Sequence, residues 1–236
     1  MINISYASWG LGNYMEYVVR IIEHKLAYPF LLNEHYAHRI PSVSFAFGLF
    51  GKSNLIGVCT FGTPASAPLR RGICGEEYAN RVLELNRLWT PNDIEHNASS
   101  YFVSRCLHLL PQPTIIVSYA DPTHNHVGYT YQALNFIYTG LSAKRTDWKI
   151  KGMEHLHGVT VADISRGQKN RAKYMREKYG EDFYLAPRAR KHRYILFAGT
   201  KRECKDMRAK LKYPIMKYPK QQDETPTLCS TCRVSH

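Results

Sequence analysis

The sequence predicts a mixed α/β fold, and three observations favour it. A β-branched apolar run at 114–117 has the composition of a strand that is buried on both faces. A loop rich in Pro, His, Asn and Gly follows, then a short helix expected over 129–136 and a second strand over 137–140. With 236 residues, of which 44% are hydrophobic, the chain is long enough to bury a large core. Strand, loop, helix and strand make a crossover unit, and ligands bind beyond the carboxyl ends of such strands.

The segments before this crossover unit alternate between strand and helix patterns. Residues 14–23 are apolar enough for a strand, with a helix start as the alternative, and 82–89 form a second strand-like run. Residues 25–36 show helical spacing, and we expect Pro29 in the first turn of that helix. The pattern also predicts a hairpin of two strands over 43–50 and 55–61, and a helix over 98–110 capped by Asn97.

The carboxyl-terminal part combines helical patterns with basic residues. We expect a polar helix over 165–179, a strand over 193–198 and a basic helix over 200–211. The order of the elements up to residue 140 (strand, helix, hairpin, strand, helix, strand, helix, strand) is that of the GCN5-related N-acetyltransferase (GNAT) fold, although the pattern alone supports only α/β or α+β with a mixed sheet. The predicted organisation is a GNAT-like core over 1–143, a basic part of the same domain over 144–220, and a flexible polar tail over 221–236.

The positive charge of the chain is unevenly distributed. The net charge is +13, yet residues 1–143 contain nine basic and nine acidic side chains, whereas residues 144–236 contain 23 basic and 10 acidic ones. Such asymmetry indicates a polyanionic partner, most simply nucleic acid, with a solubilising surface as the alternative. The predicted phosphate contacts are Arg188, Arg190, Lys191, Arg193, Lys201 and Arg202.

Other features of the composition predict a cytoplasmic protein without membrane contact. No apolar run approaches the roughly 20 residues of a membrane span, and the amino terminus lacks the regions of a signal peptide. The six cysteines are scattered and do not resemble a disulfide framework. Cys229, Cys232 and His236 form a C-x2-C-x3-H string that would need a fourth ligand to bind zinc, and a disordered tail is the alternative.

Polar residues at the ends of predicted elements are candidates for chemistry. Asp121 follows the 114–117 strand, where it can accept a proton, bind a metal or cap the loop. His35 with Asp121 and a third group, such as His124, His126 or Tyr131, would make an iron site of mixed N and O ligands. Tyr36 can act as acid, base or ligand, with core packing of His35 and Tyr36 as the alternative.

Three further candidates each have a structural alternative. Arg87 lies among apolar residues of a strand, where a buried guanidinium requires an anion, either a donor carboxylate or a phosphate, or a salt bridge with Glu84 or Asp93. Ser100, beside Ser99 at a helix start, can bind an anion or cap the helix. Tyr131 can stack on or hydrogen-bond to a nucleic-acid base, or pack in the core.

Five segments in order resemble the Mom DNA-modification proteins of phage Mu and related phages, over nearly the whole chain up to about Lys220. They are SYASWGLGNY, EHYAHRIP, ELNRLWTPND, SYADPTHNHVGYTYQALNFIYTG and RKHRYILFAGTKRECKDMRAKLKYPIMKYPK. The resemblance implies a GNAT-like fold and the conversion of adenine in phage DNA to N6-carbamoylmethyl (acetamido) adenine, which shields the genome from host restriction enzymes. The carbamoylmethyl donor stays unidentified, iron is a candidate cofactor, and a homodimer is one option for the oligomeric state.

One motif departs from the GNAT pattern. GNAT enzymes hold the coenzyme A pyrophosphate with a Q/R-x-x-G-x-G/A loop, whose glycines let backbone amides approach the phosphates. The corresponding cofactor loop here is Asn125, His126, Val127 and Gly128, and only Gly128 matches. The resemblance therefore predicts the fold while leaving acetyl-CoA use unsupported. The alternatives to a DNA-modifying transferase are an ordinary GNAT N-acetyltransferase acting on a small-molecule or protein amine, and a non-catalytic DNA-binding protein that uses the two basic helices.

Overall fold

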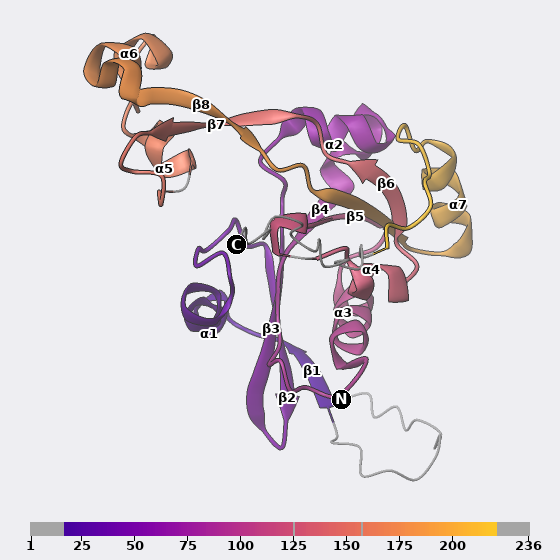
Figure 1. Ribbon diagram of the computed structural model, residues 1–236. Helices are drawn as coiled ribbons and strands as arrows, with labels where there is room; N and C mark the ends of the chain where they lie inside the picture. Colours follow the sequence, from indigo (N-terminus) through magenta and orange to yellow (C-terminus); the bar gives the residue numbers. More distant parts are fainter. Residues whose placement is uncertain (1–16, 125, 157, 221–236) are drawn as a thin grey trace, which may run out of the picture. The chain divides into compact units, whose positions relative to one another are not determined.

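The computed structural model describes residues 17–124, 126–156 and 158–220, and these form a mixed α/β fold (Figure 1). The large sheet has seven strands in the order β1-β2-β3-β4-β5-β9-β6, and β7 and β8 form a separate two-stranded sheet. The strands from β1 to β4 pair antiparallel and β4 pairs with β5 in parallel, which confirms the predicted mixed sheet. The strands are β1 Tyr17–Ile21, β2 Phe45–Gly51, β3 Asn54–Gly62, β4 Val82–Trp89, β5 Thr114–Ala120, β6 Ile137–Leu141, β7 Arg145–Ile150, β8 Phe183–Arg188 and β9 His192–Ala198.

The helices are short, and most of the predicted ones are confirmed. No described helix is long and apolar enough to cross a membrane. The helices are α1 His24–Pro29, α2 Ala67–Cys74, α3 Ala98–Leu109, α4 Tyr129–Ala133, α5 Gly158–Asp163, α6 Arg171–Tyr179 and α7 Lys201–Ala209, with a π-helical turn η1 Phe30–Glu34 and 3-10 turns η2 Glu76–Arg81, η3 Pro122–His124 and η4 Gly180–Asp182.

Three local predictions are wrong, for identifiable reasons. Pro29 is the last residue of α1 rather than in its first turn, and the π-helical turn follows it because proline cannot donate the helical N–H bond. Asn97 precedes α3 in a left-handed conformation, with φ of 68°, and its side chain makes no cap bond. The polar helix predicted from 165 begins at Arg171, because the Asn170 side chain accepts a hydrogen bond from the Lys173 amide at 3.0 Å and so caps α6 there.

The described chain divides into two compact units. The first contains residues 17–119, 130–137 and 194–214, and the second contains the described parts of 120–129, 138–193 and 215–220. The two units interleave along the chain, so neither coincides with the predicted ranges 1–143 and 144–220. The predicted tail, 221–236, lies outside the described residues.

The first unit buries its sheet under helices on both faces. Ile73 of α2 and Met207 of α7 pack with Ile115 and Val117 of β5 in one fully buried cluster. On β3, successive side chains point to opposite faces. Val58 packs with α1 and η1, whereas Cys59 contacts Cys106 of α3, so these helices lie on opposite sides of the strand (Figure 1).

A β-bulge in β4 shapes the interior of the first unit. Thr60 of β3 pairs with Arg87 and Phe61 with Leu85, so Asn86 has no partner residue on β3. The Asn86 side chain accepts a hydrogen bond from the Thr60 hydroxyl at 2.6 Å and donates one to the Ser42 carbonyl at 2.8 Å. Gly62 makes this approach feasible, because a Cβ there would lie 1.9 Å from the Ser42 carbonyl oxygen.

We expect Gly62→Ala to destabilise the protein by about 1–3 kcal/mol, the usual cost of overpacking, because a backbone atom blocks the added methyl group. Gly72→Ala in α2 is the matched control. Its Cβ would meet only the Tyr213 hydroxyl, at 3.0 Å, and alanine is favoured over glycine in a helix by about 1 kcal/mol. Urea unfolding followed by circular dichroism compares the two midpoints, and a midpoint for Gly62→Ala equal to that of the control would contradict the packing argument.

Candidate functional site

The parallel pairing of β4 with β5 ends at the pair Leu85 and Ser118. The Ser118 hydroxyl is fully buried and donates to the Leu85 carbonyl at 2.9 Å. Beyond this pair β4 continues to Trp89 without β5 beside it. Polar side chains of the first unit collect around this point, because the strands no longer satisfy one another there.

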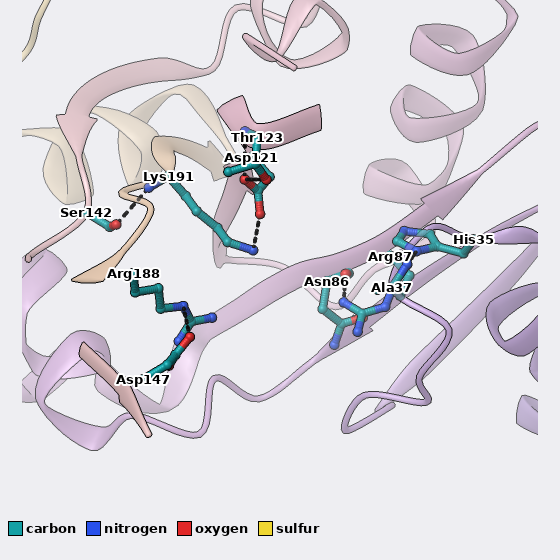
Figure 2. Close-up of polar contacts among 10 residues, drawn as sticks. All are labelled: His35, Ala37, Asn86, Arg87, Asp121, Thr123, Ser142, Asp147, Arg188 and Lys191. Atoms are coloured by element: carbon teal, nitrogen blue, oxygen red, sulfur yellow. Dashed lines mark hydrogen bonds and ion pairs between the residues drawn. The ribbon is translucent and has the colours of Figure 1, made fainter. Parts of the chain in front are cut away.

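Arg87 lies directly after the bulge, and its guanidinium is only partly satisfied. Nη1 donates to the carbonyl of Asn86 at 2.6 Å (Figure 2). Nε is buried and has no hydrogen-bond partner among the described residues. Burial lowers the pKa of Arg87, whereas Tyr36 and Glu84 raise it and Arg39 lowers it further. A guanidinium stays charged in proteins, so this side chain is a cation with one donor that no described residue uses.

His35 and Tyr36 follow η1 and stack on one another, with ring centroids 4.4 Å apart. His35 is 5% exposed, and its Nδ1 accepts a hydrogen bond from the Ala37 amide at 3.0 Å (Figure 2). The neutral ring therefore carries its proton on Nε2. Tyr36 is 44% exposed, so the pair presents one buried imidazole and one accessible phenol. Tyr36 also acts electrostatically on Arg87, which places the predicted residues His35, Tyr36 and Arg87 in one region of the first unit.

Tyr131 of α4 belongs to the same unit and is held among aromatic side chains. Its ring lies 5.4 Å from that of Phe136 and 5.3 Å from that of Tyr194. Burial raises the pKa of Tyr131 well above its ordinary value, and a hydrogen bond with Ser118 partly opposes this effect. The phenol is therefore protonated at neutral pH and suited to hydrogen bonding. The ring contacts match the core-packing alternative, and the contact with Ser118 brings the hydroxyl to the end of the β4–β5 pairing.

Asp121 belongs to the second unit and is held by a lysine and a threonine. It is 8% exposed, and its Oδ2 pairs with Lys191 Nζ at 2.8 Å (Figure 2). Oδ1 accepts hydrogen bonds from the Thr123 hydroxyl at 2.7 Å and the Thr123 amide at 3.1 Å. Burial acts to raise the pKa of Asp121, but the bonds from Lys191 and Thr123 outweigh it and hold the pKa below its usual value. Asp121 is thus ionised over the physiological range.

The residues predicted to bind a metal or a cofactor lie in different parts of the chain, and some of them are outside the described residues. His35 lies in the first unit and Asp121 in the second, and the described residues contain no group of three or more His, Cys, Asp and Glu that could hold a metal ion. In the cofactor loop, Val127 is buried, His126 is exposed and Gly128 has φ of 83°, a conformation that favours glycine. The remaining candidates, Asn125 and the side chain of His124, with Cys229, Cys232 and His236, lie outside what the structure describes.

The structure also accounts for the local contacts of the two serines. Ser100 donates to the carbonyl of Asn97 at 2.9 Å, within the first turn of α3. The Ser99 hydroxyl bonds that of Thr90 at 2.9 Å. Neither contact is a helix cap, because a capping side chain accepts a hydrogen bond from a backbone N–H of the first turn.

The predicted phosphate contacts fall into two classes. Arg193 is 8% exposed and donates to the Thr139 hydroxyl at 2.8 Å and the Thr139 carbonyl at 3.0 Å, so its guanidinium is bonded within its own unit. Arg190 donates to the carbonyl of Ser142 at 2.6 Å, and Lys191 is committed to Asp121. Cations that bond protein groups are poor phosphate ligands. The exposed members are Arg188, whose Nε lies 3.9 Å from Asp147 Oδ2, and Lys201 and Arg202 at the start of α7.

The sequence analysis missed the roles of four residues in these sites. Lys191 and Thr123 bond Asp121, and Ser118 and Asn86 lie at the end of the β4–β5 pairing and at the bulge. A single polar residue inside an apolar strand is a usable signal for Ser118 and Asn86, since a buried polar group needs a partner. Thr123 lies two residues after an aspartate, the spacing of an Asx-turn. Lys191 gives no such signal, because 70 residues separate it from Asp121.

Comparisons with known proteins give a family match and weak structural likenesses. The model of the Mom protein family matches residues 16–220. The methylcarbamoylase mom of Escherichia phage Mu is 30% identical over 200 residues, covering 83% of this chain and 80% of that protein. An N-acetyltransferase from Staphylococcus aureus matches with a TM-score of 0.41 and 11% identity, covering 78% of this chain and 99% of that one. A GNAT-family acetyltransferase from Streptococcus pneumoniae matches with a TM-score of 0.41 and 9% identity, covering 78% and 100%.

We expect Lys191→Met to raise the pKa of Asp121, because burial then acts without the opposing ammonium. Carboxyl ¹³C NMR during a pH titration measures this directly, with Lys191→Arg as the charge-retaining control. In the wild type the folded-state pKa lies below the unfolded value of about 3.9. The pair therefore stabilises the fold fully above that pH, and the contribution is lost as pH falls through the folded pKa. An unchanged Asp121 pKa in the Met variant would contradict this account of the site.

Proposed function

Because the chain belongs to the Mom protein family, we propose that it is a phage DNA-modification transferase that converts adenine in double-stranded DNA to N6-carbamoylmethyl adenine. The observation that carries the proposal is the family match over residues 16–220, joined by 30% identity to a protein named as a methylcarbamoylase. Modification of this kind would shield phage DNA from host restriction enzymes. The carbamoylmethyl donor enters the proposal as a chemical class, an activated carbamoylmethyl compound.

The reaction sets two requirements on the protein. The N6 lone pair of adenine is delocalised into the ring, so the amine needs an activated partner and a positioned acceptor for its hydrogen. The bond from N6 to the methylene carbon forms as the donor's bond to that carbon breaks, and the leaving group departs with the electron pair of the broken bond. The alkylated N6 then loses one proton to solvent water. A base inside a duplex cannot be reached, so the adenine must leave the stack.

Asp121 fits the role of a hydrogen-bond acceptor that orients the N6 amine. Its carboxylate is ionised and accepts three bonds from Lys191 and Thr123, which leaves acceptor capacity for one further donor. A base that works near neutral pH usually has a pKa near that pH, and the pKa of Asp121 is lowered instead. We therefore assign Asp121 the stabilisation of positive charge that develops on N6 as the new bond forms.

Arg87 fits the role of an anchor for an anionic group, either of the donor or of the DNA backbone. Its unused Nε–H and the adjacent Nη2 form the fork with which arginine binds carboxylates and related oxygen pairs. Tyr36, which acts electrostatically on Arg87, offers an accessible hydroxyl in the same region of the first unit.

The first test compares nucleosides from the DNA of cells that express the wild type, Asp121→Asn or the matched control Asp163→Asn, which changes an exposed carboxylate. Mass spectrometry should detect a carbamoylmethyl adduct of deoxyadenosine in the wild type and the control. We expect Asp121→Asn to reduce it by about 10²–10³, the range for loss of one group that stabilises charge in the transition state. Unmodified DNA with acetylated amines would indicate an ordinary acetyltransferase, and near wild-type modification by Asp121→Asn would remove Asp121 from the chemistry.

The second test addresses the fork of Arg87. Arg87→Lys keeps the charge and removes Nε, so we expect modification to fall by at least about tenfold, the loss of one charge-assisted hydrogen bond. Arg71→Lys, at an exposed arginine paired with Glu76, is the control and should modify DNA at the wild-type level. Equal modification by the two lysine variants would show that only the charge of Arg87 matters.

A further inference from the structure

Residues 144–188 of the second unit form a substructure with a core of its own, which we call the ribbon lobe. The strands β7 and β8 make a twisted two-stranded ribbon, with α5 and α6 gathered at one end (Figure 1). Ile150 of β7, Val161 of α5 and Met175 of α6 are its fully buried residues. Because this core lies at the helical end, the ribbon extends beyond the residues that stabilise it.

The ribbon lobe concentrates exposed positive charge. Its sequence contains 11 lysines and arginines against six aspartates and glutamates, and every one of those cations except Lys149 is exposed. Ion pairs within the described residues engage three of the exposed cations: Arg166, Lys173 and Arg188. The rest of the exposed cations in the lobe make no ion pair with any described residue. Surface pairs contribute little, so a polyanion can displace those that exist.

The cations of helix α6 fall into two groups, those that lie over aromatic rings of the lobe and those that are exposed on one face of the helix. Arg171 and Lys178 lie over aromatic rings of the lobe, at 5.8 Å from the Trp148 centroid and 5.4 Å from the Tyr179 centroid. These two cations are therefore tied to the lobe itself. Lys173 and Arg176 are three residues apart, so they lie on one face of the helix, and both are exposed.

The ribbon also exposes large apolar side chains, which a merely solvated surface does not require. Tyr184 is 40% exposed and Leu185 is 52% exposed, both on β8. Basic residues flank them, with Lys149 paired to Tyr184 across the ribbon and Arg145 paired to Arg188. Two-stranded ribbons enter DNA grooves, where exposed apolar and aromatic side chains contact sugars and bases while cations contact phosphates.

The other predicted basic helix, α7, packs against the core of the first unit. Its Met207 is buried in the core of the first unit, and Lys210 lies 4.0 Å from Glu77. Thr200 and Glu203 form a capping box at its start. Lys201 and Arg202 are exposed, but no exposed large apolar side chain lies within the helix.

We propose that the ribbon lobe is the surface that grips duplex DNA, with Lys173 and Arg176 of α6 on phosphates and β8 against a groove. The inference rests on the proposed function in taking DNA as the substrate, and it adds which surface holds that substrate. It requires nothing of the position of the lobe relative to Arg87 or His35.

The test measures binding of the full chain to a fluorescein-labelled duplex of about 25 base pairs by anisotropy, over a range of KCl concentrations. The lobe variant Lys173→Ala/Arg176→Ala is compared with Lys201→Ala/Arg202→Ala, which removes the same two charges from α7. Each lost phosphate contact should lower the log–log salt slope by about 0.9 and the affinity at 0.1 M salt by about tenfold. We expect this in the lobe variant and an unchanged slope in the control.

A third variant separates charge from apolar contact. Leu185→Ser removes no charge, so it should weaken binding while leaving the salt slope unchanged. Circular dichroism of all variants controls for folding, and the exposure of the substituted side chains predicts intact folds. Three results would each overturn the inference. They are a wild-type salt slope in the lobe variant, equal losses of binding in the lobe and α7 variants, and binding to single strands without binding to duplex.

Binding to unmodified duplex does not depend on catalysis, so the inference and the proposed function fail in distinguishable ways. Duplex binding through the lobe without any adenine adduct would refute the modification chemistry and leave the lobe as the DNA surface. If the wild type forms the adduct and the lobe variant binds duplex DNA as the wild type does, the modification chemistry stands and the lobe is not the DNA surface.

Discussion

The end of the parallel pairing between β4 and β5 is the constraint on which the arrangement of the first unit depends. β5 is almost fully buried and β4 is largely half-buried, so each backbone group that loses a strand partner must find another. The Ser118 hydroxyl donates a hydrogen bond to the Leu85 carbonyl. At the bulge, the Asn86 side chain accepts a hydrogen bond from the Thr60 hydroxyl and donates one to the Ser42 carbonyl. Each of these bonds places a polar side chain in a mostly apolar interior. Arg87, which bonds the Asn86 carbonyl, is held by a backbone irregularity rather than by an ion pair.

The protein handles its buried charges in three different ways. Arg193 is satisfied by the hydroxyl and carbonyl of Thr139, so it serves the packing of its own unit. Asp121 is satisfied by a cation and by Thr123, which stabilises its ionised form against burial. The Nε of Arg87 is buried and has no hydrogen-bond partner among the described residues, which costs on the order of 1–3 kcal/mol unless a ligand supplies one. The three charged groups therefore differ in how far the protein itself satisfies their hydrogen bonds.

The pattern of apolar residues along the sequence was enough to predict the strands and helices that bury one well-defined apolar face. The strand over 82–89 and the strand over 137–140 carry dense apolar residues, and the hairpin turn at Lys52 and Ser53 has the positive φ values that a tight turn requires. The strands β7 and β8 escaped prediction because a two-stranded ribbon in a basic region alternates weakly, with Asp147, Lys149 and Pro187 among its residues. The capping error at Asn97 arose because residue type alone does not reveal a left-handed backbone.

The positive charge of the chain therefore overstates how much of it is available to DNA. A sequence adds the charges of Lys191, Arg190 and Arg193 to those of α6, whereas the structure commits these three to Asp121, Ser142 and Thr139. Lys191 shows why the distinction matters for function. Its removal changes the electrostatics of a carboxylate that we place in the chemistry, and this effect depends only weakly on salt concentration, because Asp121 is buried and Lys191 is half-buried. Phosphate contacts on an exposed helix weaken as salt rises. Lost modification in a lysine variant is evidence of DNA contact only when it depends on ionic strength.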